Sequence, residues 1–265
     1  MIRRIGRLIS PLLFFALTGV SAQSAELRVA AASDLSFVLP EIVAGFEKQS
    51  GAQVKPSLGS SGNFAAQIQN GAPFDVFMAA DISYPRKLIE AGFADAGTLF
   101  TYGSGRIVVW VPKTNKLDFE REGLRALANG HVSKIAIANP QHAPYGRAAV
   151  AALTHERIYE PLKPKLVLGE NVSQAAQFVQ SGNADAGIVA LSLVLAPGMS
   201  DKGKYWVVPI HSYPPLEQAA VVMKSSTQPQ LARAFIEYLG SPAAKELLRR
   251  YGFAIDTPKS RGAAQ

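Results

Sequence analysis

Leu58-Gly59-Ser60-Ser61-Gly62-Asn63-Phe64 joins a predicted strand, residues 52–58, to a predicted helix that starts near residue 64. The two glycines let the backbone turn sharply, and the two serines stand where a helix N-cap belongs. The N–H groups at a helix N-terminus are free and carry a partial positive charge, so this junction is suited to holding an anion. The alternative is that Ser60 or Ser61 only caps its own helix.

Three further junctions repeat this construction, in which a strand ends in small or polar residues at the start of a helix. They are Ala32-Ser33-Asp34, Ala143-Pro144-Tyr145-Gly146 and Glu170-Asn171-Val172-Ser173. In open α/β sheets, ligands bind beyond the carboxyl ends of the strands. Two facing sheets would therefore point four helix N-termini into one cleft, which offers many N–H donors and few formal charges. Such a cleft suits a dehydrated oxyanion and provides little catalytic chemistry.

The predicted elements alternate between strand and helix, which indicates parallel sheets covered by helices. Strands are expected at 27–32, 52–58, 75–80, 106–111, 134–138, 165–169, 186–190, 205–210 and 218–223, and helices at 37–49, 64–69, 84–91, 147–153, 174–181, 228–239 and 242–251. We expect 106–111 to cross into a second lobe and 205–210 to return. Residues 218–223 are expected to form an edge or crossing strand.

These crossings predict an α/β protein of two lobes, each a mainly parallel sheet flanked by helices, joined by a two-strand hinge. Lobe 1 would comprise residues 26–105 and 213–258, and lobe 2 would comprise residues 106–212. Residues 259–265 are polar and small, and we expect them to form a disordered tail.

Residues 1–25 have the pattern of a secretory signal peptide, in which a basic start precedes a short apolar run and then small residues. Cleavage after Ala22 fits this pattern, and cleavage after Ala25 is the alternative. A signal anchor is a second interpretation, but the apolar run is too short for a membrane span. A lipoprotein anchor is excluded because the chain has no cysteine. We therefore expect an exported, periplasmic protein without stable membrane insertion.

The charge of the chain is modest once the signal peptide is set aside. The three arginines of that segment are its only charged residues, so 24 basic and 20 acidic residues remain, a net charge of +4 against +7 for the full sequence. A field of this size helps an anionic ligand approach but does not indicate nucleic-acid binding. The absence of cysteine excludes disulfides and thiolate metal sites.

The sequence carries few signs of catalysis. It has no Gly-x-Ser-x-Gly elbow, no Walker loop and no Gly-x-Gly-x-x-Gly after the first strand. The four histidines lack metal-ligand spacing and are expected at the surface, although His142 lies near a predicted ligand loop. Asp75 and Asp81 are expected to act as caps or in lobe packing. We therefore expect a binding protein that is not an enzyme and uses no cofactor.

Asp34 has two interpretations. If it faces the cleft, its carboxylate would repel a fully ionised ligand and would accept a proton from a protonated one such as hydrogen phosphate. If it points out of the cleft, it is a helix cap.

Six motifs, taken together and in this order, carry a resemblance to a known family. They are Val29-Ala30-Ala31-Ala32-Ser33, Ser60-Ser61-Gly62, the run from Gly71 to Asp81, Asn139-Pro140 with Pro144-Tyr145-Gly146, Gly187-Ile188-Val189 and Arg250-Tyr251-Gly252-Phe253. Over essentially the whole mature chain, the sequence resembles the periplasmic molybdate-binding proteins that serve ABC importers. The resemblance implies a type II periplasmic binding protein fold with a hinge of two crossing strands.

The resemblance also implies how a ligand is held. Ser33 and Ser61 would each donate a hydroxyl and a backbone N–H to a molybdate oxyanion, and Tyr145 and Val172 would each donate a backbone N–H. The metal atom would have no direct protein ligands. Ala190 stands where some members of the family carry a tyrosine donor, so that donor is absent here. Tyr145 stands where a small residue can occur, and its ring would close that side of the pocket.

The function implied is capture of molybdate, and also of tungstate, by a monomer that delivers it to an inner-membrane ABC permease with its ATPase. Both ions are fully ionised dianions near neutral pH, so a pocket of donors suits them. One alternative keeps the fold and exchanges the ligand for sulfate, thiosulfate or phosphate. Another alternative, of a different class, is an exported enzyme or sensor domain.

Overall fold

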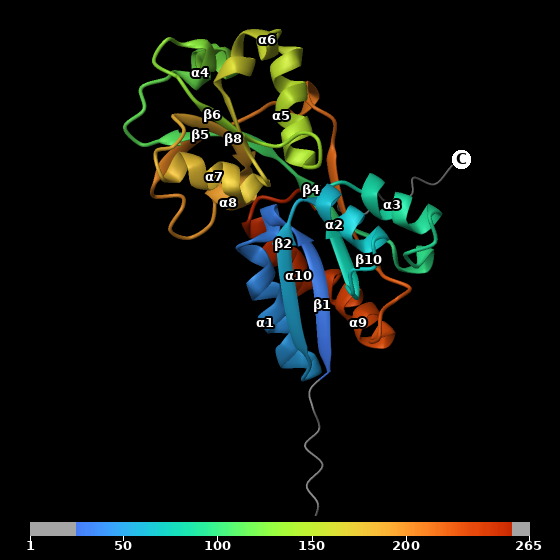
Figure 1. Ribbon diagram of the computed structural model, residues 1–265. Helices are drawn as coiled ribbons and strands as arrows, with labels where there is room; N and C mark the ends of the chain where they lie inside the picture. The colour runs from blue at the N-terminus through green and yellow to red at the C-terminus, as the bar shows by residue number, and fades with distance from the viewer. Residues whose placement is uncertain (1–24, 256–265) are drawn as a thin grey trace, which may run out of the picture.

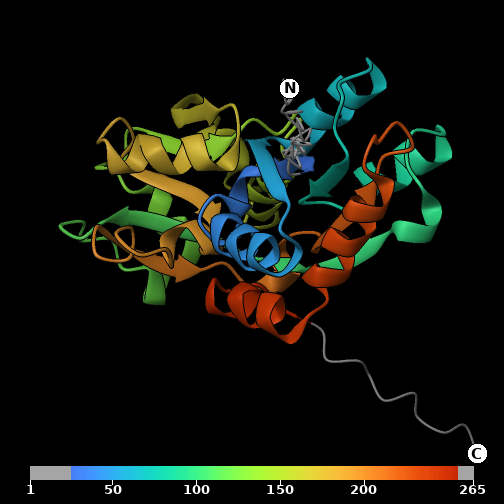
Figure 2. The same ribbon diagram turned by 90° about the horizontal axis from the view of Figure 1, so that it is seen from below.

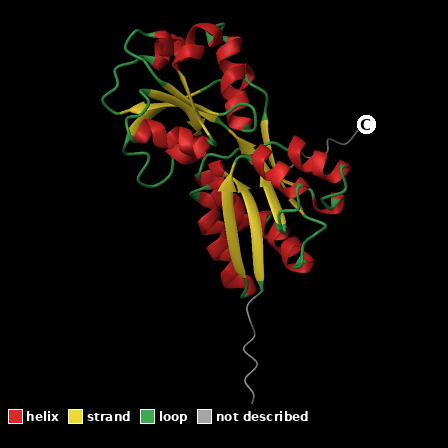
Figure 3. Cartoon of the chain, in the orientation of Figure 1, coloured by secondary structure: helices red, strands yellow, loops and turns green. Residues whose placement is uncertain are grey.

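The computed structural model describes residues 25–255 and shows two lobes, each built around a five-stranded sheet (Figure 1). Helices lie on both sides of each sheet (Figure 3). The predicted fold class is confirmed. The predicted tail and, except for residue 25, the predicted signal peptide lie outside the described residues.

The first lobe contains two segments of the chain. Its elements are β1 (Glu26–Ala32), η1 (Ser33–Leu35), α1 (Val38–Ser50), β2 (Gln53–Gly59), α2 (Ser61–Gln69), β3 (Val76–Ala79), α3 (Ser83–Glu90), η2 (Ala96–Thr98), β4 (Phe100–Gly105), β10 (Leu216–Val222), α9 (Pro229–Leu239) and α10 (Pro242–Arg250). Its sheet has the order β2-β1-β3-β10-β4.

The second lobe is formed by the chain between those two segments. Its elements are β5 (Ile107–Pro112), α4 (Phe119–Glu122), η3 (Gly123–Ala128), β6 (Ile135–Ala138), α5 (Pro144–His155), α6 (Tyr159–Leu162), η4 (Lys163–Lys165), β7 (Leu166–Gly169), α7 (Val172–Gln180), β8 (Ala186–Ala190), α8 (Leu191–Val194), β9 (Gly203–Val207) and η5 (Ile210–Ser212). Its sheet has the order β7-β6-β8-β5-β9.

The two sheets have the same topology. In the first, β1 pairs in parallel with β2 and β3, and in the second, β6 pairs in parallel with β7 and β8. Each sheet has one reversed strand, β10 or β5, next to its last parallel strand. The carboxyl ends of β1, β2, β6 and β7 therefore occupy equivalent places, and each leads into a helix where a ligand site is expected.

Two apolar clusters hold the first lobe together, because successive residues of a strand face opposite sides of the sheet. Val29 and Ala31 of β1 pack in the larger cluster, which also contains the buried face of α1. Ala30 packs with Phe77 of β3 in the smaller cluster, which contains Phe64 of α2. Figure 2 shows α1 in blue beside α9 and α10 in red, and these three helices contact one another.

The structure corrects the expectation for residues 218–223. β10 is an interior strand between β3 and β4, so it is not an edge strand. The edge position belongs to β4, which the sequence pattern did not predict because its Gly103-Ser104-Gly105 end has weak strand propensity.

The return to the first lobe also comes later than expected. Residues 203–207 form β9, which pairs with β5 at the edge of the second sheet, so the chain crosses back only between residues 208 and 215. The proposed division at residues 105/106 and 212/213 stays a prediction.

No helix among residues 25–255 has the length and apolar character that a membrane span requires.

Replacement of Phe77 by alanine tests the importance of the smaller cluster. Phe77 is fully buried, so Phe77→Ala is expected to lower the free energy of unfolding by about 3–5 kcal/mol. Urea denaturation followed by circular dichroism measures the change. Phe93→Ala is the matched control, because Phe93 is 37% exposed and its loss is expected to cost about 1 kcal/mol or less. Equal losses in the two variants would contradict this assignment of the core.

Candidate functional site

A small cavity lies between the two lobes, at the carboxyl ends of β1, β2, β6 and β7. It is lined by Ala32, Ser33, Asp34, Gly59, Ser60, Ser61 and Ala80 from the first lobe and by Ala143, Pro144, Tyr145, Asn171 and Val172 from the second. The cavity has a volume of about 10 Å³. The cavity therefore fits a ligand of a few atoms and excludes a sugar or a nucleotide.

All four residues that the sequence singles out line this cavity. Ser61 and Val172 are the first residues of α2 and α7, and Tyr145 is the second residue of α5. Ser33 is the first residue of the short helix η1. The first N–H groups of a helix have no partner within it, so their positions suit donation into the cavity. Contact of these groups with an anion stays a prediction.

The hydroxyls of Ser33 and Ser61 are set up to donate. The Oγ of Ser61 accepts a hydrogen bond from the N–H of Ala80 at 3.0 Å, and that of Ser33 accepts one from the N–H of Ser173 at 3.4 Å. A hydroxyl that accepts in this way keeps its own proton for another acceptor. Both side chains are almost fully buried, and donation from either hydroxyl to a ligand stays a prediction.

Ser60 has a different role from its neighbour. It is the N-cap of α2, and its Oγ accepts a hydrogen bond from the N–H of Asn63 at 3.4 Å. The same Oγ lies 2.8 Å from Nδ1 of His142 in the second lobe. Ser60 therefore caps its own helix, as predicted.

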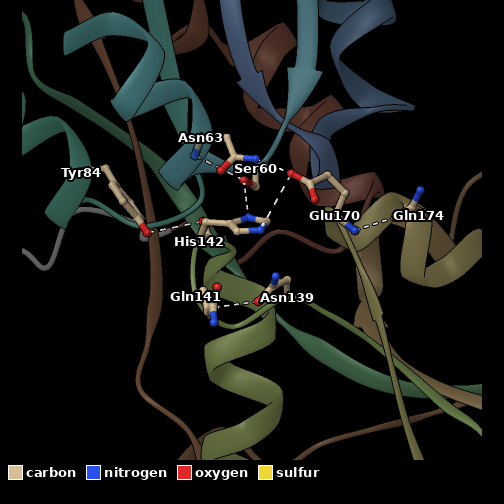
Figure 4. Close-up of polar contacts among 8 residues, drawn as sticks. All are labelled: Ser60, Asn63, Tyr84, Asn139, Gln141, His142, Glu170 and Gln174. Atoms are coloured by element: carbon tan, nitrogen blue, oxygen red, sulfur yellow. Dashed lines mark hydrogen bonds and ion pairs between the residues drawn. The ribbon is translucent and has the colours of Figure 1, made fainter. Parts of the chain in front are cut away.

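His142 joins the two lobes through a contact with Ser60, one of the residues that line the cavity (Figure 4). Besides its contact with Ser60, its Nε2 lies 3.8 Å from a carboxylate oxygen of Glu170, and Asn63 donates to the same carboxylate. The backbone oxygen of His142 accepts a hydrogen bond from Gly62 N–H at 2.9 Å. A Cβ at residue 62 would lie 2.5 Å from that oxygen, so this approach requires glycine. His142 does not line the cavity, and it bridges the lobes instead.

A second bridge between the lobes involves Arg147 of α5. Its guanidinium donates to Oδ2 of Asp81 and to the hydroxyl of Tyr84, both at 2.8 Å. Oδ1 of Asp81 accepts from the N–H of Ser83 at 2.8 Å. Asp81 therefore packs the lobes together, one of the two roles expected for it, whereas the N-cap of α3 is Ile82.

Asp34 lies inside the cavity wall and is buried, so its interpretation as an outward-facing helix cap is wrong. Its Oδ2 accepts hydrogen bonds from the hydroxyl of Tyr145 at 2.9 Å and from Nε2 of Gln218 at 2.6 Å. The Tyr145 ring thus reaches from the second lobe into the first. A Cβ at residue 105 would lie 2.1 Å from the Tyr145 hydroxyl, so this reach depends on Gly105.

The sequence reasoning missed two members of this network. Gln218 donates to Asp34, and its Oε1 accepts a hydrogen bond from the hydroxyl of Tyr102 at 2.9 Å. The available signal was a glutamine within the otherwise apolar end of β10, since a polar side chain at a core position requires partners.

Burial raises the pKa of Asp34 to about 6, although the hydrogen bonds from Gln218 and Tyr145 act in the opposite direction. Burial also raises the pKa of Tyr145 and of Tyr102, and the charge of Asp34 raises both further. None of the ion pairs within residues 25–255 includes Asp34. Asp34 is therefore a carboxyl that changes its charge close to neutral pH.

The cavity presents neutral donors and no cation. None of its lining residues is a lysine, an arginine or a histidine. Ala190 is buried at the end of β8 and does not line the cavity. Across the described part of the chain, no group of three or more His, Asp or Glu side chains could hold a metal ion. The arrangement can bind a small anion through N–H and O–H groups.

Comparison with known proteins gives matches along almost the whole chain. Residues 27–254 match a family model described as bacterial extracellular solute-binding protein. Molybdate-binding protein ModA of Azotobacter vinelandii is 42% identical over 239 residues, which cover 90% of this chain and 94% of that protein. Molybdate-binding protein ModA of Rhodobacter capsulatus is 37% identical over 235 residues, which cover 89% of this chain and 90% of that protein.

Solved structures agree with this match. The Azotobacter vinelandii periplasmic molybdate-binding protein has a TM-score of 0.82 at 36% identity, covering 87% of this chain and 100% of that chain. The sulfate-binding protein SubI from Mycobacterium tuberculosis has a TM-score of 0.72 at 16% identity, covering 88% of both chains, and shows the same fold.

The raised pKa of Asp34 predicts a pH dependence of stability in the absence of any anion. A carboxyl whose pKa is higher in the folded state stabilises the fold below pH 3.8 and loses this contribution as the pH rises through 6. As the pH rises from about 4 to about 7, the unfolding free energy of Asp34→Asn should therefore increase by roughly 2–3 kcal/mol relative to that of the unmodified protein. Urea denaturation of both proteins across this range measures the difference. A difference that stays constant with pH would refute the prediction.

Proposed function

Because the chain belongs to the bacterial extracellular solute-binding protein family, we propose that it is the molybdate-binding component of an ABC importer. The proposal places it in the periplasm and includes tungstate as a second ligand. It includes no catalytic role, since the relatives described above are binding proteins. The observation that carries the proposal is a small cavity between two lobes that is lined by neutral donors at four helix starts.

The chemistry of the cavity supports this ligand class. Molybdate and tungstate are tetrahedral dianions that accept hydrogen bonds and, near neutral pH, donate none. The hydroxyls of Ser33 and Ser61 keep their protons available, and the first N–H groups of α2, α5 and α7 lack partners within their helices. Helix N-termini also carry partial positive charge, which stabilises a dianion without a buried cation. The cavity volume suits an ion of this size.

Sulfate tests the selectivity of the proposed site, because it has the same charge and shape and a smaller radius. A hydrogen bond weakens as the distance between donor and acceptor grows. In a closed cavity, the wall sets how near its donors can come to the oxygens of a small anion. The Tyr145 ring is held in place by Asp34 and by the close contact at Gly105, so it limits how far the cavity can shrink. We therefore propose that sulfate binds more weakly than molybdate.

Delivery depends on closure of the lobes. The contacts of His142 with Ser60 and of Arg147 with Asp81 join the two lobes directly, so they form only when the lobes are together. We propose that a bound anion favours this closed state and that an inner-membrane permease with its ATPase recognises it. The proposal treats the protein as a monomer, since each cavity is complete within one chain.

Isothermal titration with molybdate, tungstate, sulfate and phosphate tests the ligand. Tight binding of molybdate and tungstate, with weaker binding of sulfate and phosphate, is the expected result. Tight sulfate binding without molybdate heat would sink the proposal. Analytical ultracentrifugation of the same samples tests the monomer, and a dimer in the presence of molybdate would contradict that part.

Two adjacent serines provide a matched pair of variants. Ser61→Ala and Ser33→Ala should each weaken molybdate binding by roughly 1.5–3 kcal/mol, as expected for a hydrogen bond to a charged group. Ser60→Ala is the control, because its hydroxyl caps α2 and contacts His142, so it should cost much less. Titration calorimetry gives the three affinities. Similar losses for Ser60→Ala and Ser61→Ala would show that the assignment of the pair is wrong.

A further inference from the structure

One oxygen of Asp34 has no hydrogen-bond partner although the side chain is buried. Its Oδ2 accepts from Tyr145 and Gln218, whereas its Oδ1 is enclosed and unpartnered. Asp34 is 1% exposed and belongs to the wall of the anion cavity. Buried polar atoms are usually paired, so this unpaired oxygen, in a residue of the cavity wall, is available to bond a ligand atom.

An ionised Asp34 and a dianion cannot share this cavity without a large repulsion. Both are negative, no cation lines the cavity, and a dehydrated site screens charge poorly. A carboxylate accepts hydrogen bonds and donates none, and molybdate is likewise only an acceptor. A protonated carboxyl removes both conflicts, because it is neutral and its O–H donates to the anion.

We propose that Asp34 carries a proton when the anion is bound and that its Oδ1 donates this proton to one anion oxygen, so that capture takes up one proton from solution. The proposal rests on the proposed function, since it concerns a fully ionised anion in the same cavity. No bond other than the carboxyl O–H is formed. The proton comes from the solvent and returns to it when the anion leaves.

The surroundings of Asp34 leave few other groups to supply this proton. The ionisable groups that face it are the phenols of Tyr145 on α5 and Tyr102 on β4, and burial raises the pKa of both. Both phenols therefore remain protonated when Asp34 titrates. The helices α7 and α8 also pack against η1 and contain no ionisable side chain.

The charged residues of β10, α5 and β2 have other partners or are exposed. Glu217 of β10 accepts from Thr101, Arg147 of α5 donates to Asp81, and Lys55 of β2 is exposed. His155, at the far end of α5, meets the ring of His211 edge-on. His142 contacts Ser60, which lines the cavity, and Glu170, so a variant of His142 serves as a separate control.

The proposal predicts a pH dependence with a defined direction. The pKa of Asp34 in the empty cavity is about 6, so above this pH the carboxyl is ionised and must gain a proton on binding. Mass action then weakens molybdate binding by about tenfold per pH unit above that pKa, or about 100-fold over two units. Below it the carboxyl is already protonated, and the affinity should level off.

Counting protons by calorimetry is the direct test. Molybdate is titrated into the full chain at about pH 7.5, in buffers that differ in ionisation enthalpy, and the slope of the heat against that enthalpy gives the protons taken up. About one proton is expected for the unmodified protein. Asp34→Asn should take up none and should lose the tenfold slope with pH, because its amide donates without titrating.

Two controls separate Asp34 from other titrating groups. Asp75→Asn changes an aspartate that is also buried in the first lobe, accepts from Arg28 N–H and Ser226, and lies outside the cavity. His142→Gln removes the imidazole that contacts Ser60. Both variants should still take up about one proton. Loss of the uptake in His142→Gln, or its persistence in Asp34→Asn, would overturn the assignment to Asp34.

The remaining outcomes are also decisive. Molybdate heat without proton uptake by the unmodified protein overturns this proposal and leaves the proposed function standing. No heat with molybdate or tungstate at about pH 6, where proton uptake is not limiting, overturns both. If Asp34→Asn does not fold, difference infrared spectroscopy of the unmodified protein replaces the calorimetric comparison with that variant. Molybdate should then convert a carboxylate band to a protonated carboxyl band, and its absence would refute the proposal.

Discussion

Free N–H groups at the starts of helices are the interaction on which the site depends. The cavity contains no lysine, arginine or histidine, so the helix starts at Ser61, Tyr145 and Val172 provide its positive potential. Such donors are fixed by the backbone and move only with whole elements, unlike a flexible lysine. In the proposed function, binding by these donors ties the anion to the relative position of the two lobes.

The equivalent topology of the lobes explains why four such helix starts meet. In each sheet the first two parallel strands, β1 and β2 or β6 and β7, end side by side and lead into helices on the cleft side. The hinge segments between the lobes turn these edges toward each other. Each half contributes a similar set of donors, and neither half alone encloses a cavity.

Two pairs of side chains connect the lobes directly. They are formed by His142 with Ser60 and by Arg147 with Asp81. Tyr145 differs from them, because its hydroxyl crosses the cleft to Asp34 while its backbone lies at the start of α5. The same residue thus shapes the cavity and connects the two lobes.

The sequence by itself determined the α/β class, most strands and helices, and the four junctions that line the cavity. Hydrophobic periodicity and the cap residues around Ser60 are local signals, so they can be read without a fold. The tertiary structure alone decided the interior position of β10, the direction of Asp34 and its partners Gln218 and Tyr102. Those contacts join residues up to 184 positions apart, and no local pattern records which distant side chains a fold brings together.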